Sequence, residues 1–324
     1  MRRTRREILG AALGAGAVAL ARPALAQSWP SRPVKIIVPF GLGGSADVIA
    51  RYLGEQMREA LGQPVVIENR PGAGAVIGTE AVVQSPADGY TLLAMSNTHT
   101  ANETLLPKRP YELMRDLTPV APVNIAYNVL VVPPSFPAKT LAELIALAKA
   151  DPGKYNYASS GPGTPYHIIG EIFRAMADIK VQHVPFRGSD QARTAVVAGT
   201  VQWMFDAIPT MVEQVRGGQV RALATTGPQR DPLLPDVPTV AETLPGFDGP
   251  IWIGLMAPAG TPKDIVERLN GEVKRVMNLP ATREWQAKLG AKPLTMSVAE
   301  FDAFLRKDIE TQRKWITQAQ IKVN

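Results

Sequence analysis

The sequence contains no cysteine and only three histidines among its 324 residues. Without cysteine there is no disulfide, no thiol nucleophile and no cysteine metal site. His99, His167 and His183 lack the spacing of a metal motif such as H-E-x-x-H. No G-x-S-x-G motif is present to activate a serine. We therefore expect no cofactor, no metal site and no enzymatic activity.

Long apolar runs are also scarce, and the one near the N-terminus is shorter than the roughly 20 residues that a membrane span needs. Four arginines among the first six residues precede this run, which covers residues 8–20, and Ala24-Leu25-Ala26 follows. The pattern is typical of a secretory signal peptide, for which we predict cleavage after Ala26 and a periplasmic destination. Residues 4–9 (TRREIL) fit a twin-arginine signal, the alternative being an ordinary arginine-rich export signal.

The chain has no marked excess of positive or negative residues once this signal is removed. The whole chain has 35 basic and 29 acidic residues, and the predicted mature part has 30 and 28. Nothing in this balance favours nucleic acid as a partner, because that needs a basic patch or stripe. The mature length of about 298 residues suggests two domains.

Short β-branched runs alternate with amphipathic stretches, which predicts an α/β fold with helices on both faces of parallel sheets. We predict strands near residues 34–38, 64–68, 90–95, 128–132, 155–158, 180–184, 201–205, 220–225 and 251–257. We predict helices near residues 46–61, 76–84, 141–148, 166–176, 190–198, 211–217, 262–277, 281–289 and 298–318. Ser45 is expected to cap the first of these helices.

Two glycine-rich loops, at residues 39–47 and 158–167, each follow a predicted strand and open a predicted helix. Open α/β sheets bind ligands outside the carboxyl ends of their strands. A helix N-terminus attracts anions through its free N–H groups and its dipole, and glycine lets a ligand approach the backbone. The two loops would therefore form a carboxylate clamp if they face each other. The alternative is a pair of ordinary tight turns, in which glycine and serine are common.

Several segments carry a family resemblance. WPSRPVKIIVPF at 29–40, GGSAD at 43–47, GQPVVIENRPGAG at 62–74 and DGYTLL at 88–93 resemble mature tripartite tricarboxylate transporter receptors, the Bug family. The resemblance continues through DLTPV at 116–120, SSG at 159–161, HVPFRG at 183–188 and LPDVPT at 234–239. It thus covers essentially the whole mature chain. The sequence departs from the usual pattern at Leu42, at 97–100 and at 165–166, so the size of the ligand stays open.

The resemblance implies a two-lobed periplasmic binding protein fold of type II-like architecture. Two parallel-rich sheets flanked by helices would be joined by two crossover segments, expected within 120–131 and 250–257. Lobe 1 would comprise residues 27–125 and 251–324, and lobe 2 residues 126–250. The implied function is capture of a small carboxylate (a dicarboxylate, amino acid or aromatic acid) between the lobes. We expect a monomer that delivers this ligand to the membrane components of a tripartite transporter; the alternatives are a sensor that presents ligand to a membrane receptor, or a periplasmic hydrolase.

The ligand-binding candidates that the resemblance implies come from both loops and from the neighbouring walls. They are Phe40, Gly43, Gly44, Ser45, Asp47, Asn97, Ser159, Ser160, Gly161, Thr164, His167, Arg187, Ser189 and Asp206.

Four of these candidates have alternative roles. Asp47 would order its loop or stabilise the helix terminus, and Asp206 would bind a ligand hydroxyl or ammonium or cap a helix. Arg187 would pair a second carboxylate or lie exposed, and His167 would donate to an anion or make a structural bond. The glycines at 72–78 have G-x-G-x-x-x-G spacing, which does not match the dinucleotide motif and predicts only a turn and a helix start.

Overall fold

The computed structural model describes residues 29–318, 320 and 321. The predicted signal peptide and its cleavage site lie outside the described residues. From Arg32 onward the chain forms one unit, and the helices and strands named below belong to it. Among the described residues, no helix combines the length and apolarity that crossing a membrane requires.

The first lobe is built on three parallel strands, as the alternating pattern predicted. β1 (Val34–Val38) lies between β2 (Val65–Asn69) and β3 (Thr91–Ser96). The helices α2 (Ser45–Leu61) and α3 (Val76–Val83) connect these strands. The buried β-branched residues of β1 fit a strand that is covered on both faces.

The start of α2 differs from the prediction in one detail. Ser45 is its first helical residue and not its cap, because Gly44 takes the extended N-cap conformation and no side chain caps the helix. The helix ends at Gly62, whose φ of 65° is the left-handed conformation typical of a C-cap.

The second lobe repeats the parallel arrangement with β6 (Gln182–Pro185), β5 (Asn156–Ser159) and β7 (Trp203–Ala207) in that order. Its helices are α6 (Leu141–Ala150), α7 (Pro165–Met176), α8 (Ser189–Val197) and α9 (Ile208–Arg216). Its core includes Trp203, Phe205 and Phe173. A separate apolar cluster of the first lobe includes Trp252, Met256 and Phe301.

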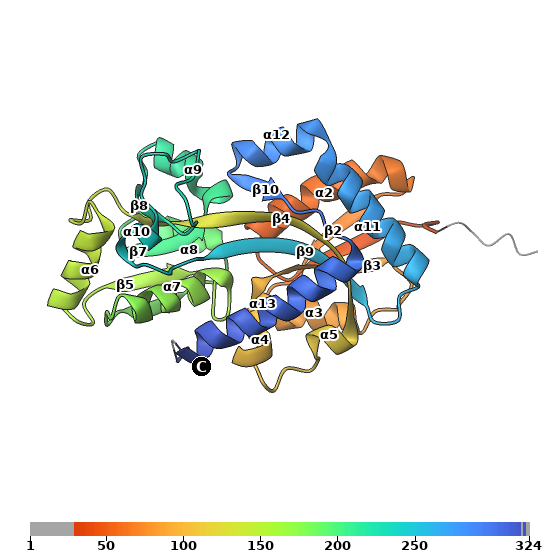
Figure 1. The fold of residues 1–324 in the computed structure, drawn as a ribbon, viewed down its shortest axis with the longest axis horizontal. Coiled ribbons are helices and arrows are strands. Elements are labelled where there is room, and N and C mark those ends of the chain that lie inside the picture. The colour runs from red at the N-terminus through yellow and green to blue at the C-terminus, as the bar shows by residue number, and fades with distance from the viewer. Residues whose placement is uncertain (1–28, 319, 322–324) are drawn as a thin grey trace, which may run out of the picture. The chain divides into compact units, whose positions relative to one another are not determined.

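Two long strands connect the lobes. β4 (Leu117–Val132) pairs with β9 (Pro250–Pro258) along Leu117–Tyr127 and then with β7 along Asn128–Val131. The strand order is β2-β1-β3-β9-β4-β7-β5-β6, and Figure 1 shows β4 and β9 side by side between the two groups of parallel strands. The predicted α/β fold with two lobes and two crossovers is therefore confirmed. The lobe boundaries near residues 125 and 250 stay a prediction.

The remaining elements complete the two lobes. The three C-terminal helices are confirmed as α11 (Lys263–Asn278), α12 (Pro280–Lys288) and α13 (Val298–Gln318), and β8 (Arg221–Thr225) lies beside β4. The pattern did not predict η1 (Ala73–Ala75), α4 (Asn97–Leu105), α5 (Leu113–Asp116), α10 (Val240–Thr243) or β10 (Ala291–Pro293). Threonine and asparagine make α4 a poor helix by propensity. Its start is stabilised instead by Ser96, whose Oγ accepts a hydrogen bond from the N–H of Thr98.

Candidate functional site

A cavity of about 360 Å³ lies where three loops of the two lobes meet. We call them the first loop (residues 39–44), the second loop (residues 159–164) and the glycine-alanine loop (residues 71–75). Among the predicted ligand-binding residues, the lining includes Phe40, Gly44, Ser45, Ser160, Gly161, Thr164, Arg187 and Ser189. The other six, namely Gly43, Asp47, Asn97, Ser159, His167 and Asp206, are outside the lining given by the described residues. The structure therefore brings both predicted loops to one cavity.

Asp47 holds the first loop in place through a hydrogen bond to its backbone. Its Oδ2 accepts a hydrogen bond of 3.0 Å from the N–H of Gly43, and its Oδ1 accepts one of 3.0 Å from Asn69 Nδ2. Arg51 Nη2 lies 2.9 Å from Oδ1. Burial disfavours the charged carboxylate, but the hydrogen bonds from Arg51, Gly43 and Asn69 outweigh it and lower the pKa of Asp47. Asp47 is thus a charged group that orders the loop without lining the cavity.

Ser45 opens α2 at the cavity wall. Ser45 is only 8% exposed, and its Oγ has no hydrogen-bond partner among the described residues. The adjoining N-terminus of α2 has no side-chain cap, so its N–H groups keep their attraction for an anion. A buried hydroxyl without a partner is unfavourable unless something binds it. This end of the cavity therefore suits a ligand with acceptor oxygens.

The second loop is shaped by two glycines and held by its own side chains. Gly161 and Gly163 have φ values of 124° and 74°, which favour glycine. Ser159 Oγ accepts a hydrogen bond of 3.1 Å from the N–H of Gly161, and Thr164 Oγ1 donates one of 2.7 Å to Gly161 O. The N–H of Gly163 donates to His167 Nδ1 at 3.1 Å. Ser159 and His167 thus support the loop and the start of α7.

Two stacked imidazoles lie behind this loop. The rings of His167 and His183 are 4.1 Å apart between centroids, and His183 Nε2 is 2.6 Å from Ser159 Oγ. Burial lowers the pKa of both histidines, that of His183 to about 3. Both rings are therefore neutral near pH 7 and supply no positive charge to a ligand.

The glycine-alanine loop was missed as part of the site. Ala73, Gly74 and Ala75 have φ values of 47°, 61° and 76°, and a left-handed conformation costs a non-glycine residue about 1–3 kcal/mol. Asn102 Nδ2 donates a 2.8 Å hydrogen bond to Gly74 O and helps to hold this conformation. The available signal was position, because the G-A-G-A run follows β2 and leads into α3 much as the first loop follows β1 and leads into α2.

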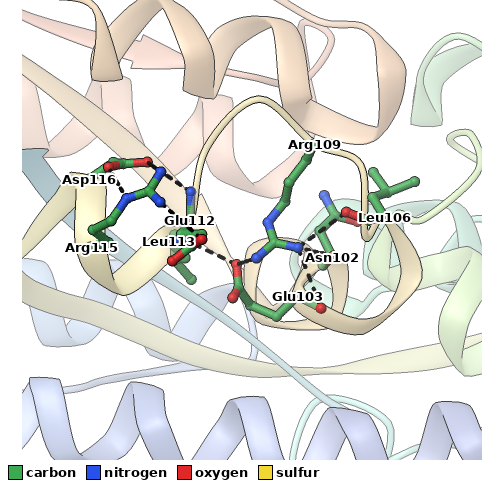
Figure 2. A network of polar contacts seen from close by, with 8 residues as sticks. All are labelled: Asn102, Glu103, Leu106, Arg109, Glu112, Leu113, Arg115 and Asp116. Carbon is green, nitrogen blue, oxygen red and sulfur yellow. Dashed lines mark hydrogen bonds and ion pairs between the residues drawn. The ribbon is translucent and has the colours of Figure 1, made fainter.

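The helix that carries Asn102 is anchored by a polar network (Figure 2). Arg109 Nη1 donates to the backbone oxygens of Asn102, Glu103 and Leu106 at the end of α4. Arg109 Nη2 pairs with Glu103 Oε1, which also accepts from the N–H of Leu113. The last carbonyl groups of α4 thereby gain partners that a helix end lacks by itself.

The cavity lining is largely apolar, with Phe40, Phe186, Ile251 and Ile253 among its side chains. Arg187 is the one charged side chain in the lining given by the described residues, and it is exposed. The arrangement can bind an anion at the loop backbones and an apolar ligand body between these walls. Within the described residues, no cluster of three or more histidine, cysteine or acidic side chains could hold a metal ion.

Comparison with known proteins places the chain in a family. The tripartite tricarboxylate transporter family receptor pattern matches residues 49–321. The chain belongs to this receptor family. The receptor is 37% identical to Protein BugT of Bordetella pertussis over 294 residues, which cover 90% of each chain. This family match confirms the resemblance, and family and fold are those of periplasmic substrate-binding receptors and not of enzymes.

Two solved structures resemble the receptor over most of both chains. An R. palustris protein whose structure contains adipate has a TM-score of 0.88 and 31% identity, over 91% of this chain and 99% of that one. MatC from Rhodopseudomonas palustris with bound malate has a TM-score of 0.85 and 33% identity, over 89% and 100%. Both relatives thus have carboxylates as ligands.

Proposed function

We propose that the receptor captures a small carboxylate in the cavity between its lobes and presents it to the membrane components of a tripartite transporter. The observation that carries this proposal is the Oγ of Ser45, which lies at the uncapped N-terminus of α2 and has no hydrogen-bond partner within the residues that the structure describes. A carboxylate there would accept hydrogen bonds from this hydroxyl and from backbone N–H groups. The adipate and malate bound by the two relatives support the same ligand class.

The second loop is proposed to complete the carboxylate site. Gly161 and Thr164 line the cavity just before α7, which begins at Pro165. Arg187, exposed at the cavity wall, is proposed to pair with a second carboxylate when the ligand is a diacid. Asp47, Ser159 and His167 would act through the loops that they hold.

A ligand screen on the mature protein tests this function. A carboxylate present at 100 times its dissociation constant should stabilise the fold by about 2.7 kcal/mol, which thermal unfolding can detect. The panel should include adipate, malate, amino acids and aromatic acids. The function would be contradicted if no acid of this panel raised the unfolding temperature.

Ser45→Ala then locates the site with the best acid of the screen. We expect weaker binding, by about tenfold, because one hydrogen bond to a charged group is lost. Ser135→Ala is the matched control, since Ser135 is exposed in a distant turn. Equal affinities of the two variants would move the carboxylate away from α2.

The route to the periplasm is a further part of the proposal. The four arginines among the first six residues support a twin-arginine signal that is cleaved after Ala26. Sequencing the N-terminus of the exported protein should find Gln27 first. Continued export in cells without the twin-arginine machinery would favour the general route instead.

A further inference from the structure

Arg193 of α8 contacts three separate pieces of backbone with one guanidinium group. Its Nη2 donates a 3.3 Å hydrogen bond to Gly43 O in the first loop. Its Nη1 donates to Thr210 O at 3.0 Å, and its Nε donates to Ser189 O at 3.3 Å. The first contact crosses from the second lobe to the first, whereas the other two stay within the second lobe.

Asp206 lies behind this guanidinium at the end of β7. Its carboxyl is fully buried, and its Oδ1 accepts hydrogen bonds from the N–H of Ala207 at 2.8 Å and from Thr210 Oγ1 at 3.2 Å. Among the described residues its Oδ2 has no hydrogen-bond partner within 3.5 Å, and it is 3.5 Å from Arg193 Nε. Burial raises the pKa of this carboxyl, and Tyr166, which also faces it, helps to lower the pKa against that effect. A buried carboxylate needs a paired cation, so Asp206 keeps the guanidinium in place.

We propose that Arg193 is a positioning residue that holds the first loop, and with it the start of α2, against the second lobe. We call its bond to Gly43 O the Arg193 clasp. Asp206 takes part by orienting Arg193 and does not contact the ligand. The clasp forms only when the lobes are close together, so it stabilises the closed arrangement even in the ligand-free receptor.

The absence of native cysteine permits a direct measurement of this closure. Spin labels on Glu59→Cys in α2 and Lys149→Cys in α6 would report the distance between the lobes, since both positions are exposed. In the ligand-free receptor, Arg193→Gln should shift the distribution toward longer distances. The ratio of closed to open molecules should fall about tenfold, as expected from losing a hydrogen bond to a charged group.

Two further variants make the test decisive. Arg193→Gln alone leaves the buried carboxylate of Asp206 without a paired cation, which destabilises the fold. The double variant Arg193→Gln/Asp206→Asn removes both charges and should open the lobes without this loss of stability. Arg216→Gln is the control, because the partner of Arg216 within the described part of the chain is Glu213 on its own helix. The clasp is overturned if the folded double variant has the same label distances as the control.

The Arg193 clasp rests on the proposed function, because closure of the lobes matters only if a ligand binds between them. The clasp and the carboxylate-binding function can nevertheless fail separately. Label distances are measured without ligand, so they test the clasp even if every acid of the panel fails. If instead adipate stabilises the receptor and the distances do not change in the Arg193 variants, the carboxylate function stands and the clasp is rejected.

Discussion

Replacing Asp308 with asparagine should stabilise the receptor above pH 6 and leave it almost unchanged near pH 4. Asp308 lies on α13, and its Oδ2 accepts a hydrogen bond of 2.5 Å from Thr100 Oγ1 on α4. Burial raises the pKa of this carboxyl to about 6, although Thr100, Trp252 and Gln312 partly offset the effect. An asparagine oxygen can still accept the hydrogen bond from Thr100.

The magnitude follows from proton linkage. The pKa of Asp308 is about 6 in the folded receptor against 3.8 for the free group, and each pH unit of difference is worth about 1.4 kcal/mol. The folded state binds the proton more tightly, so ionisation of Asp308 weakens folding as the pH rises from about 4 to about 6. Above pH 7 the charged carboxylate should therefore cost about 3 kcal/mol of stability.

Urea unfolding between pH 4 and pH 8 measures this cost. The free energy of unfolding of Asp308→Asn should exceed that of the unsubstituted receptor increasingly up to about pH 6 and by a constant amount above it. Asp302→Asn on the same helix is the control, because Asp302 pairs with Arg306 at the surface and such pairs contribute about 0–1 kcal/mol. A difference between Asp308→Asn and the unsubstituted receptor that does not change with pH would refute the reasoning.

Three other substitutions test the loops. Gly161→Ala should lower the free energy of unfolding by about 1–3 kcal/mol, because φ is 124° and the new Cβ would lie 3.2 Å from Phe186 O; equal urea midpoints would contradict this. Asn102→Ala should cost about 1–3 kcal/mol in the same assay, since Gly74 O loses its partner; an unchanged midpoint would show that Asn102 does not hold the loop. Arg187→Ala should weaken adipate more than a monocarboxylate of similar size in calorimetric titrations, and equal losses would rule out its pairing role.

The regular elements could be predicted because their patterns are local. The run of β-branched residues in β1 and the helical spacing of apolar residues in α2 are visible in the sequence itself. Both loops at the cavity also follow from position, since each connects a strand to a helix. The glycine-alanine loop was recognised as a turn, but its left-handed residues depend on the distant side chain of Asn102.

The sequence could not show which of the predicted ligand-binding side chains line the cavity and which are buried in the protein outside it. Asp206 ends an apolar strand, and neither spacing nor composition tells that its carboxyl points into the interior toward Arg193. The same holds for His167, which supports its loop from behind. These placements depend on how elements that are far apart in the sequence pack against each other. The residue pattern of a short segment does not contain that information.

The neutral, stacked rings of His167 and His183 bear on the conditions under which the receptor operates. Histidine is the side chain that ordinarily changes charge between pH 5 and 8. Burial removes His183 from that range by lowering its pKa to about 3. His183 should therefore add no charge to the second loop in either acidic or neutral media, and its contribution to carboxylate capture would not change with the pH of the medium.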